Sequence, residues 1–395
     1  MTARTENLKL RRASADDVDQ IDAIHGHPWW LRAAFADPSV GPERFTVVAD
    51  GERVVSSLCL LDGTLELEGT TFAVGSPEWV GTHPDYRNRG LVRAQLEEVH
   101  RWSDDRGDLA QIIDGIPYFY RQFGYQYAID QPARRLLPPG TELPTAEGWT
   151  VRAGEEADLP SLVALHAHGS EAADLAPVRS DADWRPSLRT PNPKAPRWLV
   201  AERDGAVGGM AMLAPEPDDR GWTTASAVTA VEADALLAIV RAIQLQSGGS
   251  GVAIAVKAAA APMLDGFTVP LPREAGFYVR VADPQRLLEH LRPVLSARLA
   301  ASPLAAASGE QVISTYVKSI VLPYERGEVG PIALSAGLQN PAADDAAGVP
   351  PDHLSELIFG RYGARGLEAR YDDVQLGRTA SLMEVLFPKL RTDFQ

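Results

Sequence analysis

The first part of the chain switches repeatedly between two hydrophobic periods. Strands are expected at residues 8–11, which alternate, at the apolar segments 45–49, 54–61 and 109–113, and at residues 65–68, 71–74, 79–82 and 125–129. Helices are expected at residues 14–25, after the N-cap Ser14, at 91–102, where apolar residues have helical spacing, and at 117–123, between Pro117 and Gly124. The Asp-Gly pairs at 50–51 and 62–63 predict hairpin turns, because glycine adopts positive φ without strain. This order predicts an α/β sandwich on a mixed sheet.

The same order then begins again. A second copy is expected as strand, helix, hairpin, strand, helix and strand at residues 149–152, 158–168, 198–213, 225–231, 233–247 and 251–256. Its hairpin parallels residues 45–61, and an Asp-Gly pair again stands at the turn, at 204–205. This self-similarity indicates an internal repeat. The copy has no Arg-x-x-Gly loop between strand and helix, and we interpret it as degenerate.

The pattern changes once more near residue 276. Strands and helices are expected at residues 278–281, 284–299, 312–322, 351–360 and 379–387, with a loop at 340–348. A single core stops growing at roughly 250–300 residues, so a chain of 395 residues is expected to divide. We predict domains at 1–145, 146–275 and 276–395, the first two α/β and the third α+β.

Charge and composition exclude several classes of function. The net charge is -15 and no basic stretch is visible, whereas proteins that grip phosphodiester backbones carry a basic face. We therefore expect no nucleic-acid partner, and the acidity suits cationic substrates such as amines. The first residues lack the apolar segment of a signal peptide, and no apolar run reaches 18 residues, so we expect no membrane span. The single cysteine, Cys59, lies in a strand and is interpreted as a buried structural thiol in a cytoplasmic protein.

The strongest local signal for chemistry lies in residues 80–94, where a strand ends, a loop turns and a helix begins. The first turn of a helix has unpaired N–H groups and a partial positive charge, which suit a pyrophosphate. Gly90 allows close approach of a ligand to the backbone, and Arg87, Arg89 and Arg93 add positive charge in an otherwise acidic chain. An ordinary helix start with three solvated arginines is the alternative.

This stretch resembles the Gln/Arg-x-x-Gly-x-Gly/Ala motif of the GNAT superfamily of N-acetyltransferases. Arg87 and Gly90 match the motif, while Val92 stands where it has a small residue. A second match lies about thirty residues on, where residues 119–125 resemble the Phe-Tyr-x-x-Phe-Gly-Tyr segment of these enzymes. Together the two motifs identify the first domain as a GNAT-type acetyltransferase domain.

Over its whole length the chain resembles the enhanced-intracellular-survival (Eis-like) acetyltransferases. Their architecture implies a catalytic GNAT domain, a second, degenerate GNAT-like domain and a C-terminal sterol-carrier-like domain. Residues 83–91 and 118–125 carry the resemblance best, and residues 354–360 and 386–389 support it. The family also implies a symmetric homo-oligomer, a hexamer.

The resemblance implies direct transfer of acetyl from acetyl-CoA to an amine, with no covalent enzyme intermediate and no metal. The tyrosine that would stand beside the coenzyme sulfur and protonate the thiolate is Tyr120, and the C-terminal carboxylate, here on Gln395, would be the base. The coenzyme would be held by the strand end and the loop, that is by Val80, Gly81, Thr82, Arg87, Asn88, Arg89, Gly90, Leu91 and Val92.

The acceptor is expected across the sheet from the coenzyme. Candidate walls of its pocket are His25, His27, Trp29, Trp30 and Phe35 from the early helices and Asp114 after a strand. Aromatic rings and acids suit a small aminoglycoside-, arylalkylamine- or lysine-like amine. Trp30 and Phe35 are equally compatible with the core. The histidines show no metal-ligand spacing.

Three other functions stay open at this stage. One is a non-catalytic lipid- or ligand-binding protein that uses the sterol-carrier-like domain. Another is an aminoacyl or peptidyl transferase with twin acetyltransferase-like domains, but such proteins bind charged tRNA and the net charge of -15 counts against it. The third is a thiol-ligand acyltransferase with tandem domains, which the third domain does not suit.

Overall fold

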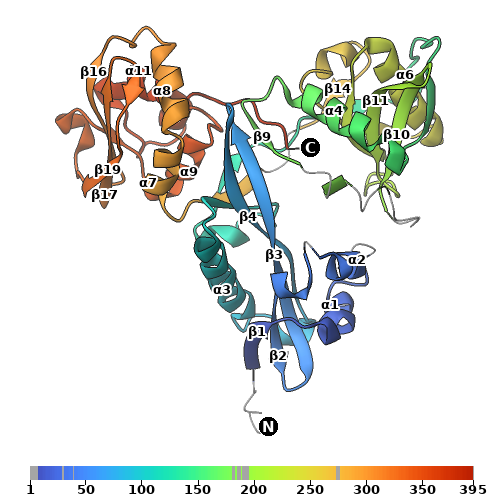
Figure 1. Cartoon of the computed structure of the whole chain (residues 1–395), viewed down its shortest axis with the longest axis horizontal. Coiled ribbons are helices and arrows are strands. Elements are labelled where there is room, and N and C mark those ends of the chain that lie inside the picture. Colours follow the sequence, from blue (N-terminus) through green and yellow to red (C-terminus); the bar gives the residue numbers. More distant parts are fainter. Residues whose placement is uncertain are drawn as a thin grey trace. The chain divides into compact units, whose positions relative to one another are not determined.

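The structure is a computed structural model that describes residues 8–28, 31–38, 40–179, 183–184, 188, 195–272 and 276–394. The chain divides into two compact units (Figure 1). The first consists of Met1–Asp130 with Ala275–Leu390, and the second of Gln131–Glu274 with Arg391–Gln395. No helix in the described ranges is both long and apolar enough to cross a membrane.

The first unit is built around a mixed sheet whose strands follow the order β1-β2-β3-β4-β5-β15-β6. These strands are β1 (Leu8–Arg12), β2 (Phe45–Asp50), β3 (Arg53–Leu67), β4 (Thr70–Thr82), β5 (Ala110–Ile113), β6 (Gln126–Ile129) and β15 (Phe277–Arg280). The helices that belong to it are η1 (Ala15–Asp17), α1 (Val18–Ile24), α2 (Leu31–Ala36), η2 (Pro42–Arg44), η3 (Pro84–Tyr86), α3 (Leu91–Arg106) and η4 (Phe119–Phe123).

Helices cover both faces of this sheet because its central strands are apolar on both sides. Leu58 and Leu60 of β3 pack under α3, whereas Cys59 packs under α1 and α2. Figure 1 shows α3 on one side of β3 and β4, with α1 and α2 on the other. Helix α3, which follows the coenzyme motif, and the early helices therefore lie on opposite faces of one sheet.

The hairpin turn predicted at Asp62-Gly63 is wrong. Both residues lie inside β3, which continues to Leu67 and pairs with β4 throughout. The chain turns at Glu68 and Gly69, which both have positive φ (44° and 83°). Asp62 tolerates the strand because its carboxylate pairs with Arg44 and Arg106.

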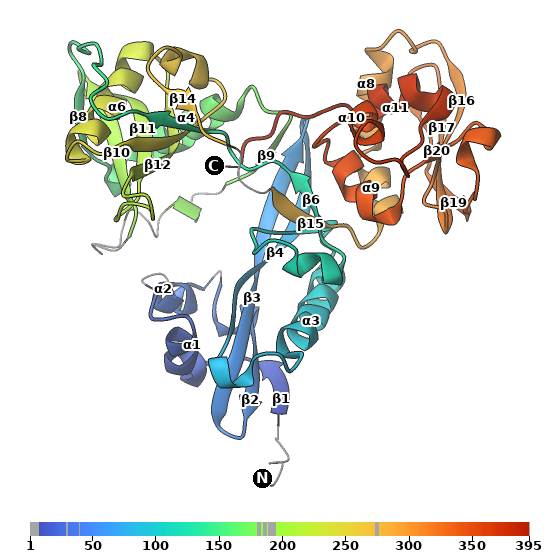
Figure 2. The same ribbon diagram turned by 180° about the vertical axis from the view of Figure 1, so that it is seen from behind.

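One strand of this sheet comes from far along the chain. β15 pairs with both β5 and β6, so residues that the sequence analysis assigned to the third domain complete the first sheet (Figure 2). Tyr278 of β15 is fully buried between these strands and its ring stacks on Tyr127 at 3.9 Å. No local pattern distinguishes such a strand from one that begins a new domain.

The rest of the first unit holds a smaller sheet of order β18-β17-β16-β20, with β19 also paired to β17. Its strands are β16 (Ser308–Ser314), β17 (Lys318–Glu325), β18 (Glu328–Val329), β19 (Ala333–Ala336) and β20 (Ala347–Gly348). Its helices are α7 (Pro284–His290), α8 (Arg292–Ala300), η7 (Pro341–Asp344), α9 (Pro351–Ile358), α10 (Ala364–Glu368), η8 (Gly377–Thr379) and α11 (Ala380–Leu386). The single helix predicted at 284–299 is two helices, because Pro293 cannot continue a helix that has already begun.

Polar contacts attach this part to the first sheet. Arg298 pairs with Glu68 at 2.7 Å, and His290 Nε2 bonds the carbonyl of Thr71 at 2.8 Å. Arg361 pairs with Asp130 at 3.0 Å and also donates to the carbonyl of Tyr127 on β6.

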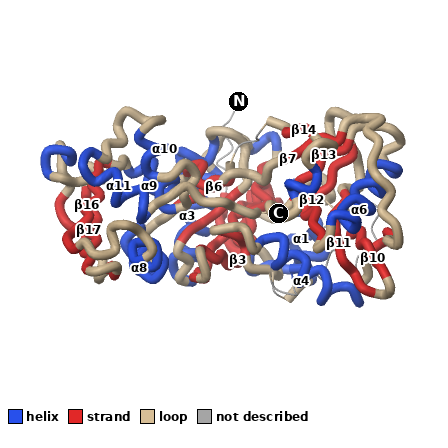
Figure 3. Tube along the Cα trace, turned by 90° about the horizontal axis from the view of Figure 1, so that it is seen from above, coloured by secondary structure: helices blue, strands red, loops and turns tan. Residues whose placement is uncertain are grey.

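The second unit is a separate mixed sheet of order β14-β7-β13-β12-β11-β10-β8 (Figure 3). The strands of this sheet are β7 (Arg134–Leu137), β8 (Thr150–Ala153), β10 (Arg197–Arg203), β11 (Ala206–Leu213), β12 (Thr223–Ala230), β13 (Val252–Val256) and β14 (Val269–Pro270). The short strand β9 (Leu175–Pro177) is not part of it. Its helices are η5 (Glu156–Asp158), α4 (Leu159–Ser170), α6 (Ala233–Gln246) and η6 (Ala261–Leu264). The two helices pack on opposite faces, α6 over Leu199 and Ala201 and α4 over Trp198 and Val200.

The two large sheets share a local arginine–aspartate pair that was not predicted from the sequence. Arg11 binds Asp17 through both guanidinium nitrogens, and Arg152 binds Asp158 in the same way and at the same sequence separation. Each aspartate also closes a capping box at the start of the helix that follows.

Candidate active site

The candidate site forms where β4 leaves β5. The two strands pair in parallel only at Val74–Gly75, and beyond that point they diverge. Between Ser57 and Cys59 the register of β3 with β4 shifts, and Trp79 has a φ of 51°. A bulge of this kind bends the strand and releases its backbone groups from the ladder. The end of β4 is therefore open on its β5 side, while Gly81 and Thr82 stay paired with Ser57 and Ser56 of β3.

The loop after β4 has a conformation that allows a ligand to approach its backbone closely. Asn88 and Gly90 both have positive φ (60° and 75°), and Gly90 is the residue that precedes the first turn of α3. A Cβ atom on Gly90 would meet nothing within 4 Å, so open space faces this backbone. The first N–H groups of a helix have no partner within the helix, and α3 has no acidic residue in its first turn. This helix start is suited to an anion.

Three arginines surround this helix start. Arg87 donates to the carbonyl of Thr82 at 3.3 Å, and Arg89 donates to the carbonyl of Asp85 at 2.7 Å. Arg93 donates to Gln122 of η4 at 2.7 Å. The three side chains place positive charge around the helix start, which suits a bound phosphate.

All of these groups line one cavity of about 860 Å³. Its walls are Ile24, His25, Val80, Gly81, Thr82, Tyr86, Arg87, Asn88, Arg89, Gly90, Leu91, Val92, Arg93, Ile116, Phe119, Tyr120, Gln122 and Phe123. The nine residues predicted to hold the coenzyme and Tyr120 therefore surround a single space. Its volume is in the range of ordinary small-molecule sites.

Tyr120 is held in η4 with only 6% of its surface exposed. Its ring packs edge-on against Phe119 and Tyr125 and lies directly over Gly115. Burial raises the pKa of Tyr120 to about 12, and the charge of Glu78 adds to this shift. The hydroxyl is thus protonated across the physiological range, and the same shift makes it a weaker acid than a free tyrosine. Tyr118, by contrast, is 77% exposed.

Glu78 was not among the site residues predicted from the sequence. In the register of β3 with β4 it faces Cys59, which packs under α1 and α2, so its side chain lies on that face of the sheet. Burial raises the pKa of Glu78 to about 7, although a hydrogen bond from Ser76 at 2.9 Å favours the charged form, and the nearby Asp114 raises the pKa further. A carboxylate with this pKa is matched to general-base catalysis at neutral pH.

Of the predicted acceptor residues that the structure describes, His25 lines the cavity, whereas His27, Phe35 and Asp114 do not. His27 is exposed and pairs with Asp22 at 2.8 Å, while Phe35 packs on Phe45 at a ring distance of 4.5 Å. Asp114 is exposed at the end of β5, beside Glu78. Trp29 and Trp30 lie outside the described residues. Of the early helices, α1 alone reaches the cavity, through Ile24 and the adjoining His25.

His25 bridges the two strands next to the bulge. Its Nε2 lies 2.8 Å from the hydroxyl of Ser57, and a Cβ on Gly81 would come within 2.7 Å of its ring. Burial lowers the pKa of His25, so the ring is neutral near pH 7. The histidine covers the end of β4 from the α1 face.

A second contact holds the same strand end from the α3 face. Ser56 donates to the carbonyl of Gly81 and contacts the hydroxyl of Thr82 at 2.8 Å. Gln95 of α3 is fully buried, lies 2.6 Å from the Ser56 hydroxyl and donates to the carbonyl of Thr46. The backbone at 81–82 is therefore fixed from both sides.

The remaining predicted groups lie away from this cavity or outside the described ranges. Gln395 is outside the described residues. Cys59 is fully buried, and burial raises the pKa of its thiol well above the usual value, so it is a structural residue as predicted. Within the described part of the chain, no three His, Cys, Asp or Glu side chains are grouped to hold a metal ion.

Comparison with known proteins agrees with this geometry. Residues 10–128 match the family model described as an acetyltransferase (GNAT) domain. No curated protein sequence matches the chain. Among solved structures, a GCN5-related N-acetyltransferase from Kribbella flavida aligns with a TM-score of 0.67 and 17% identity, over 100% of this chain and 99% of that one.

Two further structures share the fold over the full length. The GCN5-related N-acetyltransferase from Anabaena variabilis ATCC 29413 aligns with a TM-score of 0.68 at 13% identity, over 96% of this chain and 97% of its own. Eis1 from Mycobacterium abscessus aligns with a TM-score of 0.61 at 14% identity, over 98% of this chain and 99% of its own. At these identities the likeness establishes the fold, and it agrees with the predicted mixed α/β architecture.

Proposed function

We propose that this chain, a GNAT N-acetyltransferase, transfers the acetyl group of acetyl-CoA to the primary amine of a small cationic acceptor. The observation that carries the proposal is that the Gly90 helix start and the Tyr120 side chain open into the same cavity. The helix start supplies an anion site, and the tyrosine supplies a proton donor beside it.

The coenzyme would lie with its pyrophosphate at the start of α3. The N–H groups of residues 89–92 and the guanidinium groups of Arg87, Arg89 and Arg93 would bind the phosphate oxygens. The backbone of Val80 to Thr82, on the side where β4 has left β5, would then hold the acyl arm, with an N–H directed at the thioester carbonyl. Val92 is half-buried against the core on the α3 side, which leaves the loop free for the phosphates.

Transfer requires two proton movements. The amine nitrogen attacks the thioester carbonyl carbon, the C–S bond breaks, and the electron pair leaves on sulfur. Tyr120 donates its hydroxyl proton to this thiolate, and its buried position keeps it protonated until that moment. The second proton leaves the amine nitrogen and needs a base on the acceptor side.

We assign that base to Glu78. It lies on the α1–α2 face, opposite α3, and its pKa near 7 makes it an acceptor at neutral pH. The carboxylate of Gln395, which the family resemblance implies, is the competing candidate. The negative charges of Glu78 and Asp114 favour an acceptor that carries a second positive charge.

The experiment is thiol release from acetyl-CoA by the full chain with a panel of aminoglycoside, arylalkylamine and lysine-type amines, with identification of the products by mass spectrometry. Thiol release that requires an amine and yields the acetylated amine supports the proposal. If coenzyme A does not bind in a calorimetric titration, the assignment of the loop at 83–90 is wrong.

Two points complete the proposal. We propose the domain limits 1–145, 146–275 and 276–395, and limited proteolysis would test their two boundaries. We also propose a symmetric homo-oligomer, a hexamer, and light scattering on the purified chain would measure its mass.

A further inference from the structure

Strands β4 and β5 remain connected by one side chain at the point where their backbone pairing ends. The parallel pairing involves only Val74 and Gly75 of β4. The next two residues are Ser76 and Pro77, and a proline has no N–H with which to continue a ladder. Any further contact between the strands on the way to Glu78 therefore has to come from a side chain.

The side chain of Ser76 makes this contact. Its hydroxyl oxygen lies 3.0 Å from the carbonyl oxygen of Ile112 on β5 and 2.9 Å from Oε1 of Glu78. Both distances are those of hydrogen bonds, but a serine hydroxyl has a single proton to donate. The carbonyl and the ionised carboxylate therefore compete for that proton.

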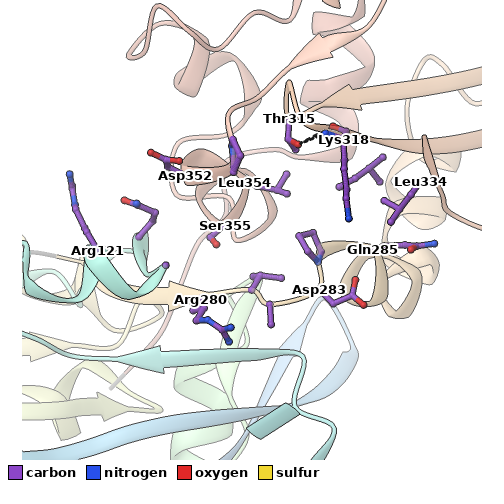
Figure 4. A pocket seen from close by; sticks show the side chains of 17 residues that line it. Arg121, Arg280, Asp283, Gln285, Thr315, Lys318, Leu334, Asp352, Leu354 and Ser355 are labelled. Carbon is purple, nitrogen blue, oxygen red and sulfur yellow. Dashed lines mark hydrogen bonds between the residues drawn. The ribbon is translucent and has the colours of Figure 1, made fainter. Parts of the chain in front are cut away.

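The β5 side of this contact is held in place by its neighbours. Gln111, which precedes Ile112, is 1% exposed and donates to the hydroxyl of Ser103 on α3 at 2.8 Å. Arg280, which Figure 4 shows on β15, donates to the amide oxygen of Gln111 at 2.7 Å. Ser76 thus connects Glu78 to a strand whose position α3 and β15 determine.

Ser76 and Glu78 lie on the same face of β4, because side chains two residues apart in a strand point the same way. In the register with β3 they stand opposite Leu61 and Cys59, which both pack toward α1 and α2. The hydroxyl is therefore on the face where the proposed reaction needs its base.

The charges around Glu78 give this hydroxyl its importance. Asp114 after β5 raises the pKa of Glu78, and Tyr120 of η4 and Cys59 of β3 are close enough for Glu78 to raise theirs. The elements that cover this face also carry Asp19, Asp22, His25, His27, Arg32, Glu43, Arg44 and Asp62, among which Arg32 pairs with Asp22 and Arg44 with Asp62. Among the described residues that act on the pKa of Glu78, Ser76 alone favours the charged form.

We propose that Ser76 is the positioning residue of the catalytic base, which orients the Glu78 carboxylate and keeps it ionised for proton transfer. While Glu78 is ionised, the hydroxyl proton of Ser76 is directed at Oε1. When the carboxylate takes the proton of the amine, an N–H bond breaks, an O–H bond forms on Glu78, and the Ser76 proton turns to the carbonyl of Ile112. This role rests on the proposed function, whereas the coupling of Ser76 to Glu78 does not.

The test begins with the free protein and needs no turnover. In the full chain with carboxyl-labelled glutamate, NMR gives the pKa of Glu78, whose signal is identified by its absence in Glu78→Gln. That pKa, about 7 in the wild type, should rise by roughly half to one pH unit in Ser76→Ala, because a donor to the charged form is lost. Ser76→Thr, which keeps a hydroxyl, should restore the wild-type pKa.

The second measurement is the pH profile of kcat for acetyl transfer. Its ascending limb should move upward by the same amount in Ser76→Ala, so that kcat at pH 7 falls about two- to fivefold, while KM for acetyl-CoA changes little. Ser302→Ala is the matched control, because it removes a half-buried hydroxyl that bonds only backbone groups after α8.

Three results would overturn the proposal. The first is an unchanged pKa of Glu78 in Ser76→Ala. The second is an equal shift in Ser76→Thr or in Ser302→Ala, which would mean that the Ser76 hydroxyl is not the cause. The third is a raised pKa together with a wild-type rate profile: Ser76 would then control the ionisation of Glu78, but Glu78 would not be the base, and the proposed function would lose that assignment.

Discussion

Gly115 and Tyr120 are in such close contact that no side chain fits between them. A Cβ atom on Gly115 would lie 2.2 Å from Cε2 of the tyrosine ring and 2.4 Å from Cδ2. Gly115 follows the strand β5 and precedes η4, so the turn between them fixes the ring by its backbone alone. The position of the proposed proton donor therefore depends on a glycine.

The substitution Gly115→Ala should consequently displace Tyr120. A misplacement of about 1 Å can cost about a hundredfold in rate, so we expect kcat to fall at least about tenfold. The affinity for coenzyme A should change little, because the helix start at Gly90 is untouched. Gly63→Ala is the matched control: it sits within β3, and its Cβ would meet only Val74, at 3.1 Å or more. Wild-type turnover by Gly115→Ala would show that the position of Tyr120 does not matter.

The pH dependence of acetyl transfer should reflect the ionisation of the Glu78 carboxyl group. Its pKa is raised from 4.5 to about 7, so the rate should increase with pH around 7 as the carboxylate loses its proton. Glu78→Gln should remove this limb and lower kcat by roughly 10²–10⁴. Removal of Gln395 should leave the limb in place. The reverse pattern, in which only loss of Gln395 abolishes the limb, would assign the base to the C-terminus.

The same ionisation has a consequence for stability. The folded-state pKa of Glu78 lies above that of the unfolded chain, so the bound proton stabilises the fold. This contribution is complete below about pH 4.5 and is lost as the pH rises through about 7. Urea unfolding at a series of pH values should show that Glu78→Gln flattens this part of the profile. An unchanged profile would mean that Glu78 ionises as an exposed group does.

The backbone that would hold the thioester is fixed by Gln95. Gln95→Leu leaves the Ser56 hydroxyl and the Thr46 carbonyl without their buried partner, and the strand end at 81–82 should loosen. We expect kcat/KM for acetyl-CoA to fall at least about tenfold. Gln244→Leu removes a comparable hydrogen bond, to the Thr141 carbonyl in the second unit, and serves as the control. Equal losses in both variants would indicate a general effect on stability.

The second unit contains a buried ion pair that should dominate its stability. Lys257 is fully buried and donates to Asp393 at 2.8 Å and to Ser170 at 3.0 Å. Lys257→Met leaves Asp393 charged and buried, which should cost about 3–5 kcal/mol in the free energy of unfolding. Lys257→Met combined with Asp393→Leu should recover most of the loss. Loss of the exposed Arg378–Asp345 pair should cost no more than about 1 kcal/mol by the same measurement.

The sequence was sufficient to predict those features whose residues all lie within one short segment. The strand, loop and helix around Gly90 were predictable because a glycine, nearby arginines and helical spacing lie within one short segment. The Asp50-Gly51 turn was predictable for the same reason. Asp62-Gly63 was not, because the choice between turn and strand depends on the ion pairs of Asp62 with Arg44 and Arg106, which are distant in sequence.

Other features depend on tertiary packing. Glu78 carries no sequence motif, and its raised pKa results from burial between strands. β15 joins the first sheet because a gap exists between β5 and β6, which no local pattern reveals. His25 lines the cavity and His27 does not, because α1 ends at Ile24 and side chains two residues apart point in different directions. One further similarity between the two copies is visible in the sequence. His25 follows Asp17 by the same number of residues as His166 follows Asp158.

The most direct test of the account compares acetyl transfer by the wild type, Tyr120→Phe and Tyr118→Phe at saturating acetyl-CoA and amine. Tyr120→Phe should retain coenzyme A affinity but lose at least about tenfold in kcat, because positioned acid catalysis contributes roughly 10²–10⁴. Tyr118→Phe should behave as the wild type does, since that side chain is 77% exposed. Wild-type turnover by Tyr120→Phe would contradict the central claim that this hydroxyl protonates the departing thiolate.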